Sequence, residues 1–393
     1  MSITFKDIKE SGGSLVVLLE GRIDSGNAHE IEDTLLAFAS KHPSMPIELD
    51  FSRLEYVSSA GLRIIVRLLK KHAAGVRITN ANREVYDVLE TTGISTLLSV
   101  SRRPRELSLE GIPQIGAGAF GRVFRLDAER VAKIYDPNVN PLASIERERQ
   151  GARQAFTHGI PSAIPFETVR AGSEFGIIYE LVDAQNIGEV VSAHPEQARE
   201  YGRRMARLAQ QLHSTRFDEG SLPDARLIFH GWIDRAEKSA LYASATIAKL
   251  REFVDGIPKG DTFVHGDFHP ANIMVMPDGE LTLIDMGDAS MGDPVIDLAG
   301  MFHVVRVAAR RPGGAKRLTG MSAELLDSLW DAFLHAYYNL DDDAQTAEIE
   351  SRLRLYAMPR TMGSTARSKL IDEETRKRQA KELEQAFICA FAK

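Results

Sequence analysis

Residues 265–272 read His-Gly-Asp-Phe-His-Pro-Ala-Asn, and the interpretation of the rest of the chain starts from this stretch. The glycine and the proline within it predict a loop, because both residues interrupt helices and strands. If the stretch were a strand, the alternating side chains of His265, Asp267 and His269 could instead chelate zinc or another transition metal. No other cluster of histidines and cysteines in the sequence would complete a closed zinc site. The loop is therefore the favoured interpretation, and zinc is the minor alternative.

The spacing of Asp267 and Asn272 matches the catalytic loop of kinases. In that loop the aspartate accepts the proton of the acceptor hydroxyl, and the asparagine binds Mg²⁺. Two short apolar runs follow, at 273–275 and 281–284, and they predict a hairpin that delivers Asp285. A carboxylate has little reason to follow an apolar strand unless a cation or a donor neutralises it. We therefore predict that Asp285 binds the Mg²⁺ that bridges the nucleotide phosphates.

A glycine-rich pattern, G-x-G-x-x-G, is formed earlier in the chain by Gly116, Gly118 and Gly121. Glycine lets a backbone approach phosphates closely, but the pattern alone is weak because any hairpin also uses glycine. A dinucleotide-binding turn would open a helix, whereas β-branched and aromatic residues follow here at 122–126. The pattern therefore favours a hairpin over ATP phosphates. The next strand carries Lys133, in the place where a kinase has the lysine that reaches the α and β phosphates.

A buried lysine of this kind needs a carboxylate to hold it in place. Glu146 and Glu148 both lie on the helix predicted after the lysine strand. We predict that Glu148 is the partner of Lys133. The alternative is that these glutamates belong to a solvated helix face and have no catalytic role.

Residues 112–300 resemble the aminoglycoside phosphotransferase family, small-molecule kinases of the protein-kinase-like fold. The matching stretches are GAGAFGRVF, VAKIY, the Glu148 helix ending at GIP, LAQQLHS, HGDFHPANIMV, LIDMGDA and GDPVIDLAG. We expect the resemblance to fade after about residue 310, which leaves the helical tail unassigned.

The resemblance implies a role for each residue of the predicted site. Asp267 would be the catalytic base, Asn272 and Asp285 the Mg²⁺ ligands, and Lys133 and Glu148 an ion pair.

The resemblance also implies a hinge between two lobes. Backbone groups of Glu180 and Val182 would pair with adenine there, and Asp293 and Asp297 would brace the catalytic loop.

Residues 1–100 alternate strand and helix patterns with short loops, which predicts one α/β layer domain. They resemble a STAS domain, the fold of anti-sigma-factor antagonists, in the runs LEGRID, IELDFS, VSSAGLR and GVRITNANREVYDVLETTGI. Family members often place a phosphorylatable residue directly before the helix glycine, but this chain has Ala60 there. Ser58 and Ser59 lie just upstream, and we favour N-capping over phosphorylation as their role.

The charge, the cysteine count and the apolar runs of the sequence exclude several classes of function. The chain has 393 residues, with 48 Lys and Arg against 55 Asp and Glu, so its net charge of -7 gives no general attraction for nucleic acid or anionic membrane. The single cysteine, Cys389, excludes a disulfide framework. The N-terminal sequence has no signal-peptide pattern, and no apolar run is long enough to span a membrane. We therefore expect a cytoplasmic protein with neither nucleic acid nor membrane as a partner.

The predicted fold has two domains, an α/β STAS domain with a mixed sheet and helices, followed by an α+β bilobal protein-kinase-like domain. The predicted boundaries are 1–100 for the STAS domain, 101–111 for a linker, 112–182 for the kinase-like N-lobe, and 183–393 for a helical C-lobe with the catalytic loop.

The predicted function is an ATP- and Mg²⁺-dependent phosphotransferase that acts on a hydroxyl of a small molecule or protein. The STAS domain would regulate or target the enzyme through a possible protein partner. The alternative is a nucleotide-binding signalling scaffold in a partner-switching pathway, without catalytic turnover.

Overall fold

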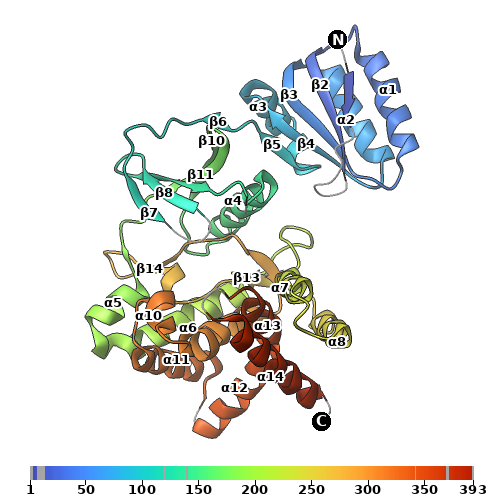
Figure 1. Cartoon of the computed structure of the whole chain (residues 1–393). Coiled ribbons are helices and arrows are strands. Elements are labelled where there is room, and N and C mark those ends of the chain that lie inside the picture. Colours follow the sequence, from blue (N-terminus) through green and yellow to red (C-terminus); the bar gives the residue numbers. More distant parts are fainter. Residues whose placement is uncertain are drawn as a thin grey trace. The chain divides into compact units, whose positions relative to one another are not determined.

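The computed structural model describes residues 3–6, 14–117, 121–138, 140–340, 342–368 and 371–391. The chain divides into two compact units, one of residues 1–109 with 168–175, and the other of residues 110–167 with 176–393. Figure 1 follows the chain from the blue N-terminus to the red C-terminus. Each unit is described by itself.

The described part of the first unit contains a five-stranded mixed sheet, in the order β1-β2-β3-β4-β5. Its strands are β1 (Ile3–Lys6), β2 (Leu15–Ile23), β3 (Ile47–Val57), β4 (Val76–Ala81) and β5 (Val100–Arg102). Strand β1 is antiparallel to β2, and the other neighbouring strands are parallel. The helices are α1 (Ala28–Lys41), α2 (Ser59–Lys71) and α3 (Arg83–Thr91), with a 3₁₀ turn at Ile94–Thr96. This arrangement confirms the predicted α/β domain with a mixed sheet.

The start of α2 explains the serines at 58 and 59. Ser58 is the N-cap, and its hydroxyl accepts a hydrogen bond from the Gly61 amide at 3.4 Å. A Cβ at position 61 would lie 2.7 Å from a methyl carbon of Ile23, so the glycine lets the helix pack closely on β2. Ser59 is exposed at the first helical position. Capping is therefore the role of Ser58, as we favoured, whereas Ser59 makes no cap contact.

A second sheet follows along the chain, in the order β6-β10-β11-β9-β8-β7. Its strands are β6 (Arg105–Glu106), β7 (Gln114–Ala117), β8 (Gly121–Arg125), β9 (Arg130–Tyr135), β10 (Pro165–Ala171) and β11 (Glu174–Glu180). The neighbouring strands β7, β8 and β9 are antiparallel, as the predicted glycine-rich hairpin requires. Helix α4 (Leu142–Thr157) connects β9 to β10.

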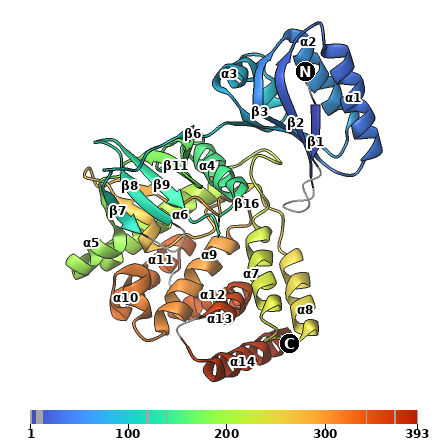
Figure 2. The ribbon, with the colours of Figure 1, turned by 45° about the horizontal axis from the view of Figure 1, so that its top comes forward.

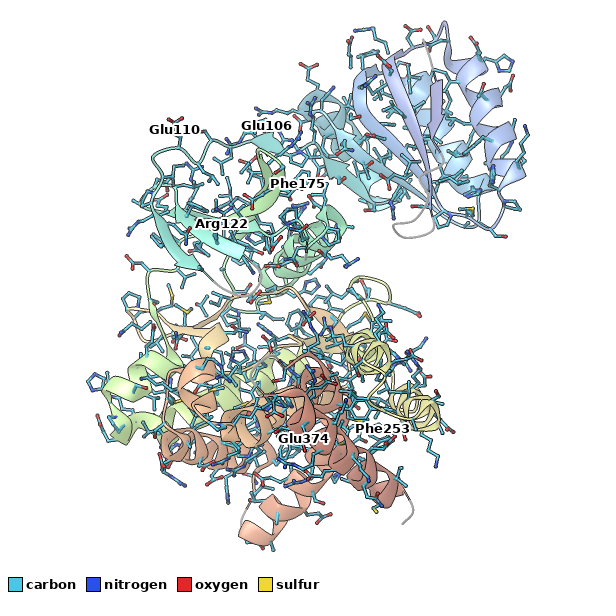
Figure 3. The ribbon with its side chains drawn as sticks, viewed as in Figure 1. Glu106, Glu110, Arg122, Phe175, Phe253 and Glu374 are labelled. Carbon is cyan, nitrogen blue, oxygen red and sulfur yellow. The ribbon has the colours of Figure 1, made fainter. Side chains whose placement is uncertain are left out.

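The segment that we predicted to be the linker, 101–111, contains regular structure at its start. Strand β5 extends to Arg102, and β6 pairs in parallel with β10. The Leu107 amide also donates to the Arg170 carbonyl at 2.7 Å, and Arg170 lies 3.6 Å from the Glu106 carboxylate (labelled in Figure 3). Strands of two or three residues have no periodicity to detect, which is why the sequence did not predict them.

The remainder of the second unit is mainly helical. Its helices are α5 (Ile187–Ala193), α6 (Ala198–Ser214), α7 (Arg226–Lys238), α8 (Ser244–Asp255), α9 (Val295–Phe302), α10 (Gly314–Thr319), α11 (Ala323–Tyr338), α12 (Asp343–Tyr356), α13 (Met358–Arg367) and α14 (Glu373–Phe391). Short strands form two small sheets: β12 (Gln185–Asn186), β14 (Ile273–Val275) and β15 (Leu281–Leu283) in one, and β13 (Thr262–Val264) and β16 (Ser290–Gly292) in the other. Figures 1 and 2 show helices α5–α14 gathered on one side of the β7–β11 sheet, which confirms the predicted bilobal fold.

Helices pack closely against one another in the second unit. Helix α6 meets α11 at Gly202, where a Cβ would lie 2.3 Å from the Leu329 carbonyl oxygen. Trp330 and Phe333 of α11 are fully buried and stack with ring centroids 5.6 Å apart. Phe253 on α8 (labelled in Figure 3) lies 5.1 Å, between ring centroids, from Tyr356.

None of the helices in the described residues is both long and apolar enough to cross a membrane.

Candidate active site

The catalytic segment leaves β13, runs through the loop at 265–269 and ends in a 3₁₀ turn at Pro270–Asn272 before β14. Gly266 has a φ of +82°, a conformation that side chains with a Cβ rarely adopt. A Cβ there would also lie 2.5 Å from the Cβ of Asp288. The loop geometry therefore depends on this glycine, as the sequence predicts.

Asp267 is surrounded by three donors. Arg360 of α13 lies 2.5 Å from its Oδ1, and His269 Nε2 lies 3.3 Å from its Oδ2. Asn272 Nδ2 donates to the Asp267 carbonyl at 2.9 Å and to Oδ2 at 3.2 Å. Burial would raise the pKa of Asp267, but the charges of His269 and Arg360 outweigh it and hold that pKa well below its usual value. Asp267 is therefore an ionised carboxylate at neutral pH.

Asp297 on α9 holds the start of the loop. Its buried carboxylate accepts hydrogen bonds from the amides of His265, at 2.8 Å, and Gly266, at 2.6 Å. His213 of α6 lies 3.3 Å from the same carboxylate. This is the bracing contact that we expected of Asp297. Asp293 differs, because its carboxylate accepts from the Val295 amide in the first turn of α9 and makes no recorded hydrogen bond to the loop in the described residues.

His265 does not converge with Asp267 and His269 on a metal. Its Nε2 lies 3.1 Å from the Ile284 carbonyl oxygen. In the part of the chain that the structure describes, no three His, Cys, Asp or Glu side chains come together to hold a metal ion. The zinc alternative is therefore wrong for these residues.

Lys133 on β9 links two carboxylates. Its Nζ lies 2.8 Å from Glu148 Oε1 on α4 and 2.8 Å from Asp285 Oδ1, after β15. The Tyr179 hydroxyl donates to the same Glu148 oxygen at 3.1 Å. Burial disfavours the charge on Lys133, but the two carboxylates outweigh it and raise the pKa of the lysine above its ordinary value. Glu146, the other candidate, pairs with Arg149 instead.

Asp285 has a strained backbone and a free oxygen. Its φ of +64° is unusual for a residue with a side chain, and such strain is concentrated at functional sites. The Ile284 amide donates to the Asn272 carbonyl at 3.0 Å, which fixes Asp285 beside the catalytic loop. Oδ2 of Asp285 and Oδ1 of Asn272 have no recorded hydrogen-bond partner among the described residues. Two free oxygens fit Mg²⁺, which takes oxygen ligands and keeps several waters or phosphate oxygens in its coordination shell.

The glycine-rich loop is only partly described. Gly118 lies outside the described residues. At Gly121 a Cβ would lie 2.1 Å from the Ile134 carbonyl oxygen, so the hairpin itself requires glycine. At Gly116 a Cβ would meet Val123 at an ordinary 3.6 Å and no other described residue, so packing within the described chain does not explain that glycine.

The predicted adenine contacts are Glu180, the last residue of β11, and Val182, just after this strand. The Glu180 amide is already used, donating to the Ile164 carbonyl at 2.9 Å. The Val182 carbonyl accepts from the Ala184 amide at 3.0 Å, whereas the Val182 amide has no recorded acceptor among the described residues. Glu180 and Val182 also line a cavity of about 250 Å³ that does not include Lys133. The adenine-pairing role of both residues stays a prediction.

Sequence reasoning missed two residues beside Asp267. Arg360 lies 93 positions further along the chain, beyond the stretch of resemblance, and no motif points to it. Asp288 is part of the run LIDMGDA, but we gave it no role. Its carboxylate has no ion-pair partner among the described residues. Burial, followed by the negative charge of Asp267, raises the pKa of Asp288 to about 6.

The fold defines a protein with an α/β domain followed by a bilobal kinase-like domain. A family model described as "Phosphotransferase enzyme family" matches residues 111–341, and one described as "Mlab, STAS domain" matches residues 7–99. The chain therefore belongs to the phosphotransferase enzyme family and has a STAS domain at its N-terminus. The family match continues past residue 310, where we expected the resemblance to fade, but it ends before Arg360.

Individual relatives resemble one part of the chain each. The putative anti-sigma factor antagonist BtrV of Bordetella bronchiseptica is 30% identical over 92 residues, which cover 23% of this chain and 78% of BtrV. Aminoglycoside phosphotransferase APH(3'')-Id from Streptomyces rimosus, solved with ADP and streptomycin, is 20% identical, with a TM-score of 0.43 over 64% of this chain and 92% of that one. An anti-sigma factor antagonist from Mycobacterium paratuberculosis is 24% identical, with a TM-score of 0.23 over 25% of this chain and 86% of that one.

Proposed function

We propose that this chain transfers the γ-phosphoryl group of ATP, with Mg²⁺, to a hydroxyl of a small molecule or protein. The observation that carries the proposal is the arrangement around Lys133, which bonds to both Glu148 and Asp285. Active protein kinases need this lysine–glutamate pair together with the metal-binding aspartate. The family match supports phosphotransferase activity independently.

Each residue would contribute one part of the reaction. Asp267 accepts the proton of the acceptor hydroxyl as the new O–P bond forms and the bond to the leaving ADP oxygen breaks. Lys133 holds the α and β phosphates, and Glu148 fixes the position of Lys133. Asn272 Oδ1 and Asp285 Oδ2 would hold Mg²⁺, which neutralises charge on the phosphates when it is bound. Arg360 keeps the carboxylate of Asp267 oriented and ionised.

The test is ADP release by the full-length protein with ATP, Mg²⁺ and a panel of hydroxyl compounds and STAS proteins. Asp267→Ala should lower transfer by about 10²–10⁴-fold, because it removes the general base, while ATP binding measured by calorimetry persists. Asp261→Ala is the matched control, since Asp261 forms a largely exposed ion pair with Arg216. Near-normal turnover in Asp267→Ala would exclude the assignment. If the protein binds ATP but releases no ADP with any acceptor of the panel, the scaffold alternative is favoured.

We also propose that the STAS domain regulates or targets the phosphotransferase through a protein partner. The similarity to BtrV over most of that protein's length supports a partner-binding role. Steady-state kinetics of residues 105–393, compared with the full chain, separate regulation from targeting. Changed rate or nucleotide constants would support regulation, and unchanged constants would leave the domain as a docking module.

A further inference from the structure

Helices α7 and α13 cross directly beside the catalytic loop. A Cβ on Gly363 of α13 would lie 2.4 Å from the Trp232 carbonyl oxygen of α7, so the two backbones are in contact. Arg360 and Arg367 lie three residues before and four residues after this glycine, and therefore on the same face of α13. That face carries two arginines toward the crossing point.

Three arginines form a cluster around this crossing: Arg235, Arg360 and Arg367, which we call the arginine cluster. The guanidinium carbon of Arg235 lies 4.2 Å from the ring centroid of Trp232, and that of Arg360 lies 5.6 Å from the same centroid. Arg360 then reaches Asp267 at 2.5 Å. The cluster therefore begins at the predicted base and extends away from it along α7 and α13.

Among the described residues, one arginine of the arginine cluster forms a direct ion pair and two do not. Arg360 pairs with Asp267, but in the described chain neither Arg235 nor Arg367 forms an ion pair with a carboxylate. Asp234, next to Arg235, pairs with Arg251 instead. Burial and then the charge of Arg367 lower the pKa of Arg235, so this half-buried guanidinium is held at an electrostatic cost.

Asp288 and Asp234 are the two carboxylates that act electrostatically on Arg235. Asp288 forms no ion pair with Arg235 in the described part of the chain. The pKa of Asp288 is raised to about 6, so at neutral pH it contributes at most one negative charge. Arg235 and Arg367 are therefore two guanidinium groups that no direct ion pair neutralises in the described residues.

We propose that Arg235 and Arg367 bind an anionic group, a phosphate or a carboxylate, on the compound whose hydroxyl Asp267 deprotonates. The proposal rests on the proposed phosphotransfer, because it assigns the subsite to the acceptor. The planar guanidinium fork matches the oxygens of both anions, and stacking on Trp232 keeps the fork of Arg235 in place. Cationic amino sugars would meet like charge at this position. The acceptor is therefore an anionic hydroxyl compound.

Four matched probes differ only in the group beside their hydroxyls: glycerol, glycerate, glycerol 3-phosphate and 3-amino-1,2-propanediol. Binding to the full-length protein is measured by calorimetry with saturating ADP and Mg²⁺, which keeps the probes out of the nucleotide phosphate site. We expect the two anionic probes to bind more tightly than glycerol, and the amine to bind no better. Comparing glycerate with glycerol 3-phosphate distinguishes a carboxylate from a phosphate as the preferred group.

Arg235→Gln and Arg367→Gln should each weaken binding of the anionic probes about tenfold, the loss expected for one charge-assisted contact. Arg203→Gln removes an exposed arginine paired with Glu200 and should leave binding unchanged. Equal binding of all four probes, tighter binding of the amine, or anion binding that survives both cluster variants would overturn the proposal. ADP release is measured separately, so anion binding without turnover would count against the phosphotransfer while the anion site stands.

Discussion

Lys133→Met tests whether the lysine neutralises a buried carboxylate. The Lys133 and Glu148 side chains are 18% and 8% exposed and lie 2.8 Å apart, so the substitution leaves Glu148 buried without its cation. Breaking a buried ion pair costs about 3–5 kcal/mol, and partial exposure of Lys133 places the expected cost near about 3 kcal/mol. A loss of about 1 kcal/mol lowers the melting temperature of a large domain by roughly 2 °C, so the kinase-like unit should melt roughly 6 °C lower.

The double variant Lys133→Met/Glu148→Gln tests whether the loss of stability comes from the unpaired Glu148 carboxylate. It removes Glu148, the more buried of the two carboxylates that lose their lysine, so it should regain at least half of the lost melting temperature, measured by calorimetry on the full chain. Phosphoryl transfer should be lost in both variants, since the lysine is absent from both. Lys377→Met, which breaks an exposed pair with Glu373, is the control and should melt like the unmodified protein. The reasoning fails if Lys133→Met melts like this control, or if the double variant is no more stable than Lys133→Met.

Three further substitutions test the carboxylates of the site. Asp285→Asn removes a charge from the predicted Mg²⁺ site, so ATP affinity measured by calorimetry should lose its dependence on Mg²⁺; an unchanged dependence would place the metal elsewhere. Asp297→Ala leaves two loop amides without their acceptor, at about 1–3 kcal/mol each, so melting temperature and transfer rate should both fall. Because the pKa of Asp288 is raised to about 6, its ionisation costs stability as pH rises from about 4 to 6. Asp288→Asn should therefore melt above the unmodified protein near pH 7.5, by a margin that shrinks near pH 5; a margin independent of pH would contradict the shift.

The sequence predicts the fold well where an element has an apolar pattern of its own. The helices and the longer strands of the first unit each have their own apolar pattern, so the alternation of these elements was visible before any contact was known. The glycine-rich hairpin was predictable because the residues at 122–126 are β-branched and aromatic. The short strands β1, β5 and β6 were missed, since two to four residues form strands through pairing with a neighbour and not through their own pattern.

The candidate site also has residues that the sequence predicts and residues that it does not. The pairing of Lys133 with Glu148 could be predicted because both residues occur in motifs with a fixed order along the chain. Arg360 could not, because its place beside Asp267 depends on the packing of α13 against α7. Asp293 shows the opposite error, since its position in a familiar run suggested a bracing role, whereas its carboxylate contacts the first turn of α9.

Four aspartates of this site have the same side chain and different electrostatic surroundings. Asp267 is ionised because Arg360 and His269 reach it, and Asp285 is held by Lys133. Asp297 satisfies backbone amides, whereas Asp288 meets no cation directly and has a pKa raised to about 6. The partners come from different parts of the fold. Those of Asp267 lie on α13 and in the loop, that of Asp285 lies on β9, and those of Asp297 are amides of the loop backbone. Spacing in the sequence can therefore locate the carboxylates, but only the tertiary structure decides which is a base, which can bind a metal and which can respond to pH.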